Sequence, residues 1–112
     1  MESQDLKRLV HFSNDALQRE PVHESLRIWS ELLCLSSNQS FGPVRDPDSD
    51  AVFLVVAGEA AFQVDGRRRR LQQWSTVLVP ADAEVVVNNA SVDPLVVLVT
   101  AAPPPVVREV TG

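Results

Sequence analysis

Short apolar runs alternate with clusters of turn-forming residues over most of the chain. The apolar runs are rich in valine, and most of them end at Gly, Pro, Asp or Asn. Branched side chains favour the pleated, half-buried surface of a sheet, so the pattern predicts strands from residue 25 onward. We expect strands at residues 26–35, 52–56, 60–64, 67–71, 76–79, 85–87 and 95–100.

The residues between these runs predict how the strands connect. Asp65-Gly66 separates two strand-like runs, and this dipeptide is a strong short-range signal for a β-hairpin. Pro80 and Asn88-Asn89 end two further strands, and the run 103–105 is all proline, which cannot enter a central strand. Short strands spaced about 8–12 residues apart are typical of an all-β sandwich or barrel.

The first 24 residues have a different, mostly polar pattern. Leu6, Leu9 and Val10 could share one face of a short helix, and Pro21 would end any helix that began near Ser13. We therefore expect three parts in the chain: an N-terminal arm at 1–24, a β domain at 25–102 and a Pro-rich C-terminal tail at 103–112.

Composition narrows the classes of protein. The chain has 112 residues, of which 45% are hydrophobic, so we expect one domain with its own core. The formal net charge of -5 argues against a nucleic-acid binder and against a polybasic membrane anchor. Lys7 is the only lysine among ten Lys and Arg residues, a bias that fits a GC-rich bacterial gene.

The sequence carries no sign of export or of membrane insertion. Its N-terminus lacks the apolar stretch of about 7–15 residues that marks a secretory signal. No apolar run approaches the roughly 18 residues of a membrane span. We therefore expect a cytoplasmic protein without a membrane partner.

Several residues stand at the positions of two known sequence motifs. Gly58 is followed by the hairpin signal at Asp65-Gly66 and then by Pro80 and Asn89. In this order and spacing the stretch resembles the cupin superfamily, whose motifs read G-x5-H-x-H-x3/4-E-x6-G and G-x5-P-x-G-x2-H-x3-N. The resemblance covers about residues 26–102. It implies a small antiparallel jelly-roll β-barrel of the RmlC-like kind.

The resemblance also implies where a cupin metal would sit, and the ligands are absent from this sequence. Ala51 stands at the position of the family's glutamate ligand, and Val85 at the position of its last histidine. The two histidines of H-x-H are replaced by Arg45 and Pro47 or, in the alternative spacing, by Val44 and Asp46. A transition metal needs three or four converging His, Cys or carboxylate groups. We therefore expect no metal and no cofactor.

If inward positions follow the family, the barrel interior is apolar. Phe53, Val55 and Val87 would then point inward, with Arg45 at the rim. Trp74 replaces a motif glycine, so its bulk could cap the barrel mouth or fill a dimer contact. The predicted ligand pocket consists of Arg45, Pro47, Ala51, Phe53, Trp74, Val85 and Val87. Such residues can equally fill a small barrel.

Other chemistry-bearing residues have ordinary structural explanations. Asp46, Asp48 and Asp50 alternate as in a calcium loop, but the glycine and glutamate of an EF-hand are missing, which favours a solvated turn. The arginines at 67–70 fit a hairpin strand whose side chains alternate between two faces. Cys34 lies in an apolar run, which is typical of a buried thiol.

Three functional interpretations remain open. The leading one is a non-catalytic, metal-free homodimer that binds a small, partly apolar ligand or a protein partner. We expect the dimer because exposed β edges associate, and because relatives pair barrel against barrel with an N-terminal segment crossing over. The second is a metal-independent isomerase or epimerase acting on a small anionic metabolite, with Arg45 as clamp and His23 or Glu84 as base. The third is a structural dimer with a filled barrel.

Overall fold

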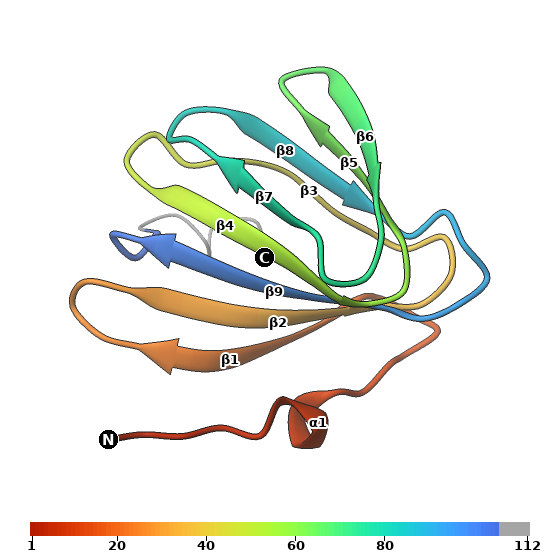
Figure 1. The fold of residues 1–112 in the computed structure, drawn as a ribbon, viewed down its shortest axis with the longest axis horizontal. Helices are drawn as coiled ribbons and strands as arrows, with labels where there is room; N and C mark the ends of the chain where they lie inside the picture. Colours follow the sequence, from red (N-terminus) through yellow and green to blue (C-terminus); the bar gives the residue numbers. More distant parts are fainter. Residues whose placement is uncertain (106–112) are drawn as a thin grey trace.

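The computed structural model describes residues 1–105, which form two antiparallel β-sheets and one short helix (Figure 1). The five-stranded sheet has, in spatial order, β1 (Gln18–Glu24), β2 (Trp29–Leu35), β9 (Leu95–Ala102), β4 (Asp50–Ala57) and β7 (Thr76–Val79). The four-stranded sheet has β3 (Ser40–Arg45), β8 (Glu84–Asn88), β5 (Ala60–Val64) and β6 (Arg67–Leu71). This jelly-roll arrangement confirms the predicted all-β fold class, with two sheets in place of one closed barrel.

The turn chemistry read from the sequence positions most strands. Asp65 and Gly66 both have positive φ, at 48° and 83°, as the tight turn between β5 and β6 requires. The bounds of β5, β6 and β7 agree with the predicted ones. Strand β2 begins later than predicted, because the Ser25 N–H donates to the Ile28 carbonyl and residues 25–28 form a turn.

Two strands were not predicted. Strand β1 occupies the end of the expected N-terminal arm, so the sheet begins at Gln18. Pro21 does not end a helix there; it lies in an edge strand, where a missing N–H is tolerated, beside a bulge between Pro21 and His23. Strand β3 contains Gly42, at φ 97°, next to a second bulge, which interrupts the alternation that the sequence pattern depends on.

The main core fills the space between the two sheets. Phe53 is its centre, with ring centroids 6.3 Å from Phe41 and 5.4 Å from Phe62, the latter edge-to-face. Two residues of the family motifs serve this packing. Asn89 is buried and donates to the carbonyls of Leu35 and Asp93, at 3.0 and 2.8 Å. Gly58 is the second of these motif residues. It lies so close to Pro94 that a Cβ on Gly58 would be 2.4 Å from the Pro94 carbonyl oxygen.

A smaller apolar cluster lies on the outer face of the five-stranded sheet. Leu32, Cys34 and Val96 are buried there beneath Leu6 and Leu9 of helix α1 (Leu6–Leu9). The predicted helical turn in the arm is therefore present, but it packs on its own chain's sheet. Burial raises the pKa of the Cys34 thiol, as expected for an inert buried cysteine. In residues 1–105 no helix is long and apolar enough to cross a membrane.

Candidate functional site

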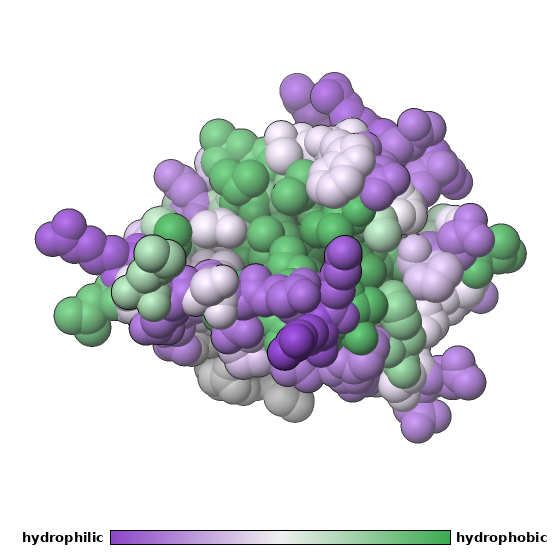
Figure 2. Space-filling view, turned by 60° about the horizontal axis from the view of Figure 1, so that its bottom comes forward, coloured by the Kyte–Doolittle hydropathy of each residue, from purple (hydrophilic) through white to green (hydrophobic). Residues whose placement is uncertain are grey.

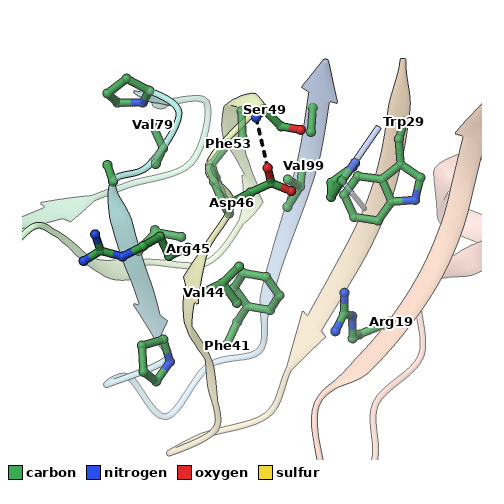
Figure 3. A pocket seen from close by; sticks show the side chains of 17 residues that line it. Arg19, Trp29, Phe41, Val44, Arg45, Asp46, Ser49, Phe53, Val79 and Val99 are labelled. Carbon is green, nitrogen blue, oxygen red and sulfur yellow. Dashed lines mark hydrogen bonds between the residues drawn. The ribbon is translucent and has the colours of Figure 1, made fainter. Parts of the chain in front are cut away.

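A cavity of about 150 Å³ lies between the sheets at the end of β3 (Figure 3). Its floor is apolar and comes from both sheets, with Phe41, Phe53, Val79, Val85, Val99 and Ala101. Its polar side chains are fewer: Arg19 from β1, and Arg45, Asp46 and Ser49 from the end of β3 and the turn that follows. An apolar cavity with a few polar groups is the common form of a small-molecule site.

Four of the seven predicted pocket residues line this cavity, namely Arg45, Ala51, Phe53 and Val85. Val87 is fully buried in the core but does not reach the cavity. Pro47 lies in the turn after β3 and is not among the lining residues. Trp74 is 69% exposed in the turn before β7, where its backbone N–H donates to the Val55 carbonyl, and it does not line this cavity.

Sequence reasoning missed Arg19, Phe41 and Trp29 as cavity residues. Arg19 and Phe41 lie on the two strands that were not predicted, so no inward direction could be assigned to them. Trp29 opens β2 and is almost completely buried. Its strand was predicted, but every residue of that strand is buried, so alternation gave no signal for the face that Trp29 occupies.

Asp46 is held rigidly at the cavity mouth. Its Oδ1 accepts hydrogen bonds from the backbone N–H groups of Asp48 and Ser49, at 2.9 and 3.0 Å. Its own carbonyl accepts from the Asp82 N–H at 2.7 Å. The second carboxylate oxygen, Oδ2, is buried and has no hydrogen-bond partner among residues 1–105. Figure 3 shows this carboxylate pointing into the space beside Val99.

Arg19 is the second charged group that lines the cavity. Its Nη2 lies 2.8 Å from Glu31 Oε1, and its Nε donates to the same oxygen at 2.9 Å. The Glu31 side chain is 10% exposed and the Arg19 side chain 34%, so the ion pair is partly shielded from water. The guanidinium carbon also lies 5.4 Å from the centroid of the Phe41 ring. The Arg19 charge is therefore already balanced inside the protein.

Several solved structures have the same fold as this chain. No protein-family model matches the sequence, and no curated protein does. Among solved structures, TT1209 from Thermus thermophilus is 31% identical with a TM-score of 0.89, over 94% of this chain and 100% of that one. An RmlC-like cupin protein from Desulfovibrio desulfuricans is 26% identical with a TM-score of 0.81, over 93% and 98% of the two chains. A Klebsiella pneumoniae protein with a double-stranded β-helix domain is 18% identical, over 92% and 90%, with a TM-score of 0.85.

The chain belongs to the cupin superfamily. It is a small, single-domain cupin, as the sequence motifs had indicated.

In this cupin the family's metal positions gather around the cavity, but their side chains do not suit a metal. Val44 pairs with Val85 across β3 and β8, and both line the cavity together with Asp46 and Ala51. The geometry thus favours the second spacing of the first motif, since Arg45 is half exposed and its Nη1 lies 3.8 Å from an Asp82 carboxylate oxygen. One carboxylate among apolar side chains does not satisfy a transition metal.

The remaining candidate residues of this cupin lie elsewhere. His23 and Glu84, the two bases considered for an enzyme, do not line the cavity. Asp50 accepts a hydrogen bond from the Ala81 N–H at 2.8 Å, so it orders a turn as Asp46 does. In the part of the chain that the structure describes, no three His, Cys, Asp or Glu side chains come together to hold a metal ion. The arginines of β6 are exposed, and Arg70 pairs with Glu59.

Proposed function

We propose that this cupin binds a small, partly apolar molecule in the cavity between its sheets and performs no metal chemistry there. The observation that carries the proposal is the open space itself. About 150 Å³ is left between side chains that include Phe53, Val85 and Val99. An apolar protein cavity of about this volume admits a molecule the size of benzene. The cavity therefore favours a ligand site over a filled barrel.

The charged groups of the cavity support binding more than catalysis. General acid–base chemistry needs a titratable side chain within hydrogen-bond reach of the substrate, oriented by a second group. Among the described residues, the charged side chains that line the cavity are Asp46 and two arginines, of which Arg19 is paired and Arg45 is half exposed. One carboxylate and two arginines can orient a ligand and fix its polar end.

The proposal is tested by narrowing the cavity. Ala51 faces the cavity, and the next residue, Val52, faces outward from the same strand. Ala51→Leu places three more carbons in the cavity, whereas Val52→Leu adds one carbon on the outer face. We expect toluene to bind the wild-type protein and the Val52 variant equally, and Ala51→Leu about tenfold more weakly or worse, because the added carbons take up space and apolar contact area that the probe needs. Ligand-observed NMR measures the affinities, and thermal melts confirm that both variants are folded.

No binding of toluene to the wild-type protein would contradict the proposal. Equal binding by Ala51→Leu would also contradict it, because the probe would then occupy another part of the molecule.

We also propose that the protein functions as a homodimer joined through the outer face of its five-stranded sheet. The residues of helix α1 pack on β2 and β9. On the neighbouring strands β4 and β7, Val52 pairs with Leu78, and these two side chains are 42% and 63% exposed. Figure 2, turned so that the bottom of Figure 1 comes forward, shows apolar side chains gathered in the middle of the view with polar ones around them.

A second copy of the chain is the partner that this face suits best. Each copy carries a formal net charge of -5, which opposes association, so two copies need a contact surface that adds no further repulsion. The outward side chains at Val52, Leu54, Thr76 and Leu78 carry no charge. Strand β7 is also the edge of its sheet, where backbone groups can pair with another strand.

A further inference from the structure

Within residues 1–105, one polar atom of the cavity has incomplete hydrogen bonding. Asp46 Oδ2 is buried and without a hydrogen-bond partner in residues 1–105, although it belongs to a carboxylate. We propose that the ligand of this cavity is an organic amine, bound as an ammonium ion that donates to Asp46 Oδ2. The inference rests on the proposed function, since it names the chemical class of the molecule that the cavity binds.

The position of Asp46 directs Oδ2 toward the ligand space. The opposite oxygen, Oδ1, is occupied by the N–H groups of Asp48 and Ser49. Rotating the carboxylate away from the cavity would break these two bonds and leave a buried donor unsatisfied, because Ser49 is itself buried. Oδ2 therefore remains available as an acceptor at a fixed position, which suits a directional hydrogen bond from a ligand.

The charge balance of the cavity favours a cation. The Arg19 guanidinium is neutralised by Glu31 at 2.8 Å. The Arg45 side chain is 53% exposed and is directed to Asp82, at 3.8 Å, on the rim. Asp46 takes part in no ion pair within residues 1–105, so among the described lining residues it is a buried negative charge without a counterion. Burying an unpaired carboxylate is costly, and a ligand with a positive charge and N–H donors removes that cost.

The aromatic walls suit the same ligand. Trp29, Phe41 and Phe53 border the cavity, and aromatic faces attract ammonium groups as well as apolar ring systems. Phe41 already has a cation near its ring, the Arg19 guanidinium at 5.4 Å. A volume of about 150 Å³ admits one six-membered ring with a short arm. The expected ligand is therefore a small aryl or cycloalkyl amine, with its ring on the apolar floor and its nitrogen at Asp46.

Three probes of the same shape test the inference: benzylamine, benzyl alcohol and benzoate. They share one ring and differ in the polar group, which is a cation, a neutral donor and an anion. At pH 7 we expect wild-type protein to bind benzylamine about tenfold or more tightly than benzyl alcohol, because a charge-assisted bond is roughly twice as strong as a neutral one. Benzoate should bind most weakly. Isothermal titration at fixed salt gives the three affinities.

Asp46→Asn is the decisive variant. An asparagine keeps Oδ1 as acceptor for the Asp48 and Ser49 N–H groups, so the turn is preserved, but it presents an NH2 donor where Oδ2 was. We expect benzylamine to lose its advantage over benzyl alcohol in this variant. Asp48→Asn is the matched control, because it removes the same charge from an exposed residue of the same turn and should leave the preference unchanged.

Each result separates this inference from the proposed function. Equal binding of benzylamine and benzyl alcohol by the wild-type protein would overturn the ammonium inference and leave the cavity as a ligand site. Preference for benzoate would overturn it in favour of an anion held by the arginines. Retention of the benzylamine preference in Asp46→Asn would overturn the role of Asp46. If none of the three probes, nor toluene, binds the wild-type protein, both proposals are wrong. Thermal melts of each variant confirm that loss of preference is not loss of the fold.

Discussion

At some motif positions this cupin keeps the residue type of the family, and at others it has a different one. Gly58 and Asn89 match the family motifs and stabilise the fold. Gly58 allows the backbone to approach Pro94 closely, and Asn89 donates hydrogen bonds to two backbone carbonyls. Ala51 and Val85, by contrast, stand where the family has metal ligands, and they now form apolar walls of the cavity. The same two motifs thus keep these scaffold residues, whereas two of their metal-ligand positions have apolar side chains.

The close approach of Pro94 to Gly58 can be tested by substitution. The φ of Gly58 is 86°, and a Cβ would lie 2.4 Å from the Pro94 carbonyl oxygen. Gly58→Ala should destabilise the fold by about 2–3 kcal/mol, because backbone strain and a steric clash add together. Gly66 has a similar φ of 83°, but nothing lies within 4 Å of the position that a Cβ would take, so Gly66→Ala should cost only about 1 kcal/mol. Urea unfolding of both variants measures the difference.

Equal costs for the two glycines would contradict this account. The loss would then come from the left-handed backbone alone, and the close approach of Pro94 to Gly58 would not matter for stability.

The sequence did not decide whether Asp46 stands at a ligand position of the family motif. Two spacings of the H-x-H motif were compatible with the sequence, and they place different residues at the ligand positions. Only the register of β3 on β8, with Val44 opposite Val85, decides between them. A bulge in β3 shifts that register, and bulges leave little trace in a hydrophobic pattern.

Elements were predictable where turn chemistry and alternation agree. The hairpin of β5 and β6 follows from Asp65-Gly66, and Pro80 marks the end of β7. Strands β1 and β3 were missed because Pro21 and Gly42-Pro43 lie inside them, and these residues normally interrupt strands. Arg19 and Phe41 of the cavity come from these two elements, which explains why the predicted pocket was incomplete.

The protection of Cys34 by helix α1 can be tested by chemical labelling. The helix covers Cys34, whose thiol pKa is raised by burial, so the thiol should react slowly with a labelling reagent near pH 8. Replacing both Leu6 and Leu9 with Asp should displace the helix and increase the labelling rate of Cys34 by about tenfold or more, since local opening controls access to a buried group. Arg8→Asp, on the exposed side of the same turn, is the control.

An unchanged rate in the double variant would mean that α1 does not protect Cys34. The raised pKa also has a consequence for stability: the free energy of unfolding should fall as the pH rises above about 8.5, where the unfolded chain releases this proton more readily than the folded one.

The molecule has two separate apolar surfaces, which are the cavity between the sheets and the outer face at Val52 and Leu78. The cavity is enclosed by strands of both sheets, whereas the outer face belongs to β4 and β7 of the five-stranded sheet alone. We therefore expect that substitutions on opposite sides of one strand change the proposed ligand binding and the proposed dimer independently.

Light scattering tests the dimer. The wild-type protein should have about twice the chain mass of 12.3 kDa. Leu78→Lys places a charge on the apolar outer face and should weaken the dimer by about tenfold or more in dissociation constant. Val92→Lys adds the same charge at an exposed apolar residue in the loop before β9 and should leave the dimer intact.

A wild-type monomer at micromolar concentration would rule out the dimer. Dissociation by Val92→Lys to the same extent as by Leu78→Lys would place the contact elsewhere.

The central claim is that this cupin uses its cavity, without a metal, to hold a small amine. A crystal structure of the wild-type protein soaked with benzylamine tests it most directly. We predict ring density against Phe53 and Val99, with the ligand nitrogen about 2.7–2.9 Å from Asp46 Oδ2. A cavity filled by its own side chains, or a benzylamine bound only at the surface, would contradict the claim.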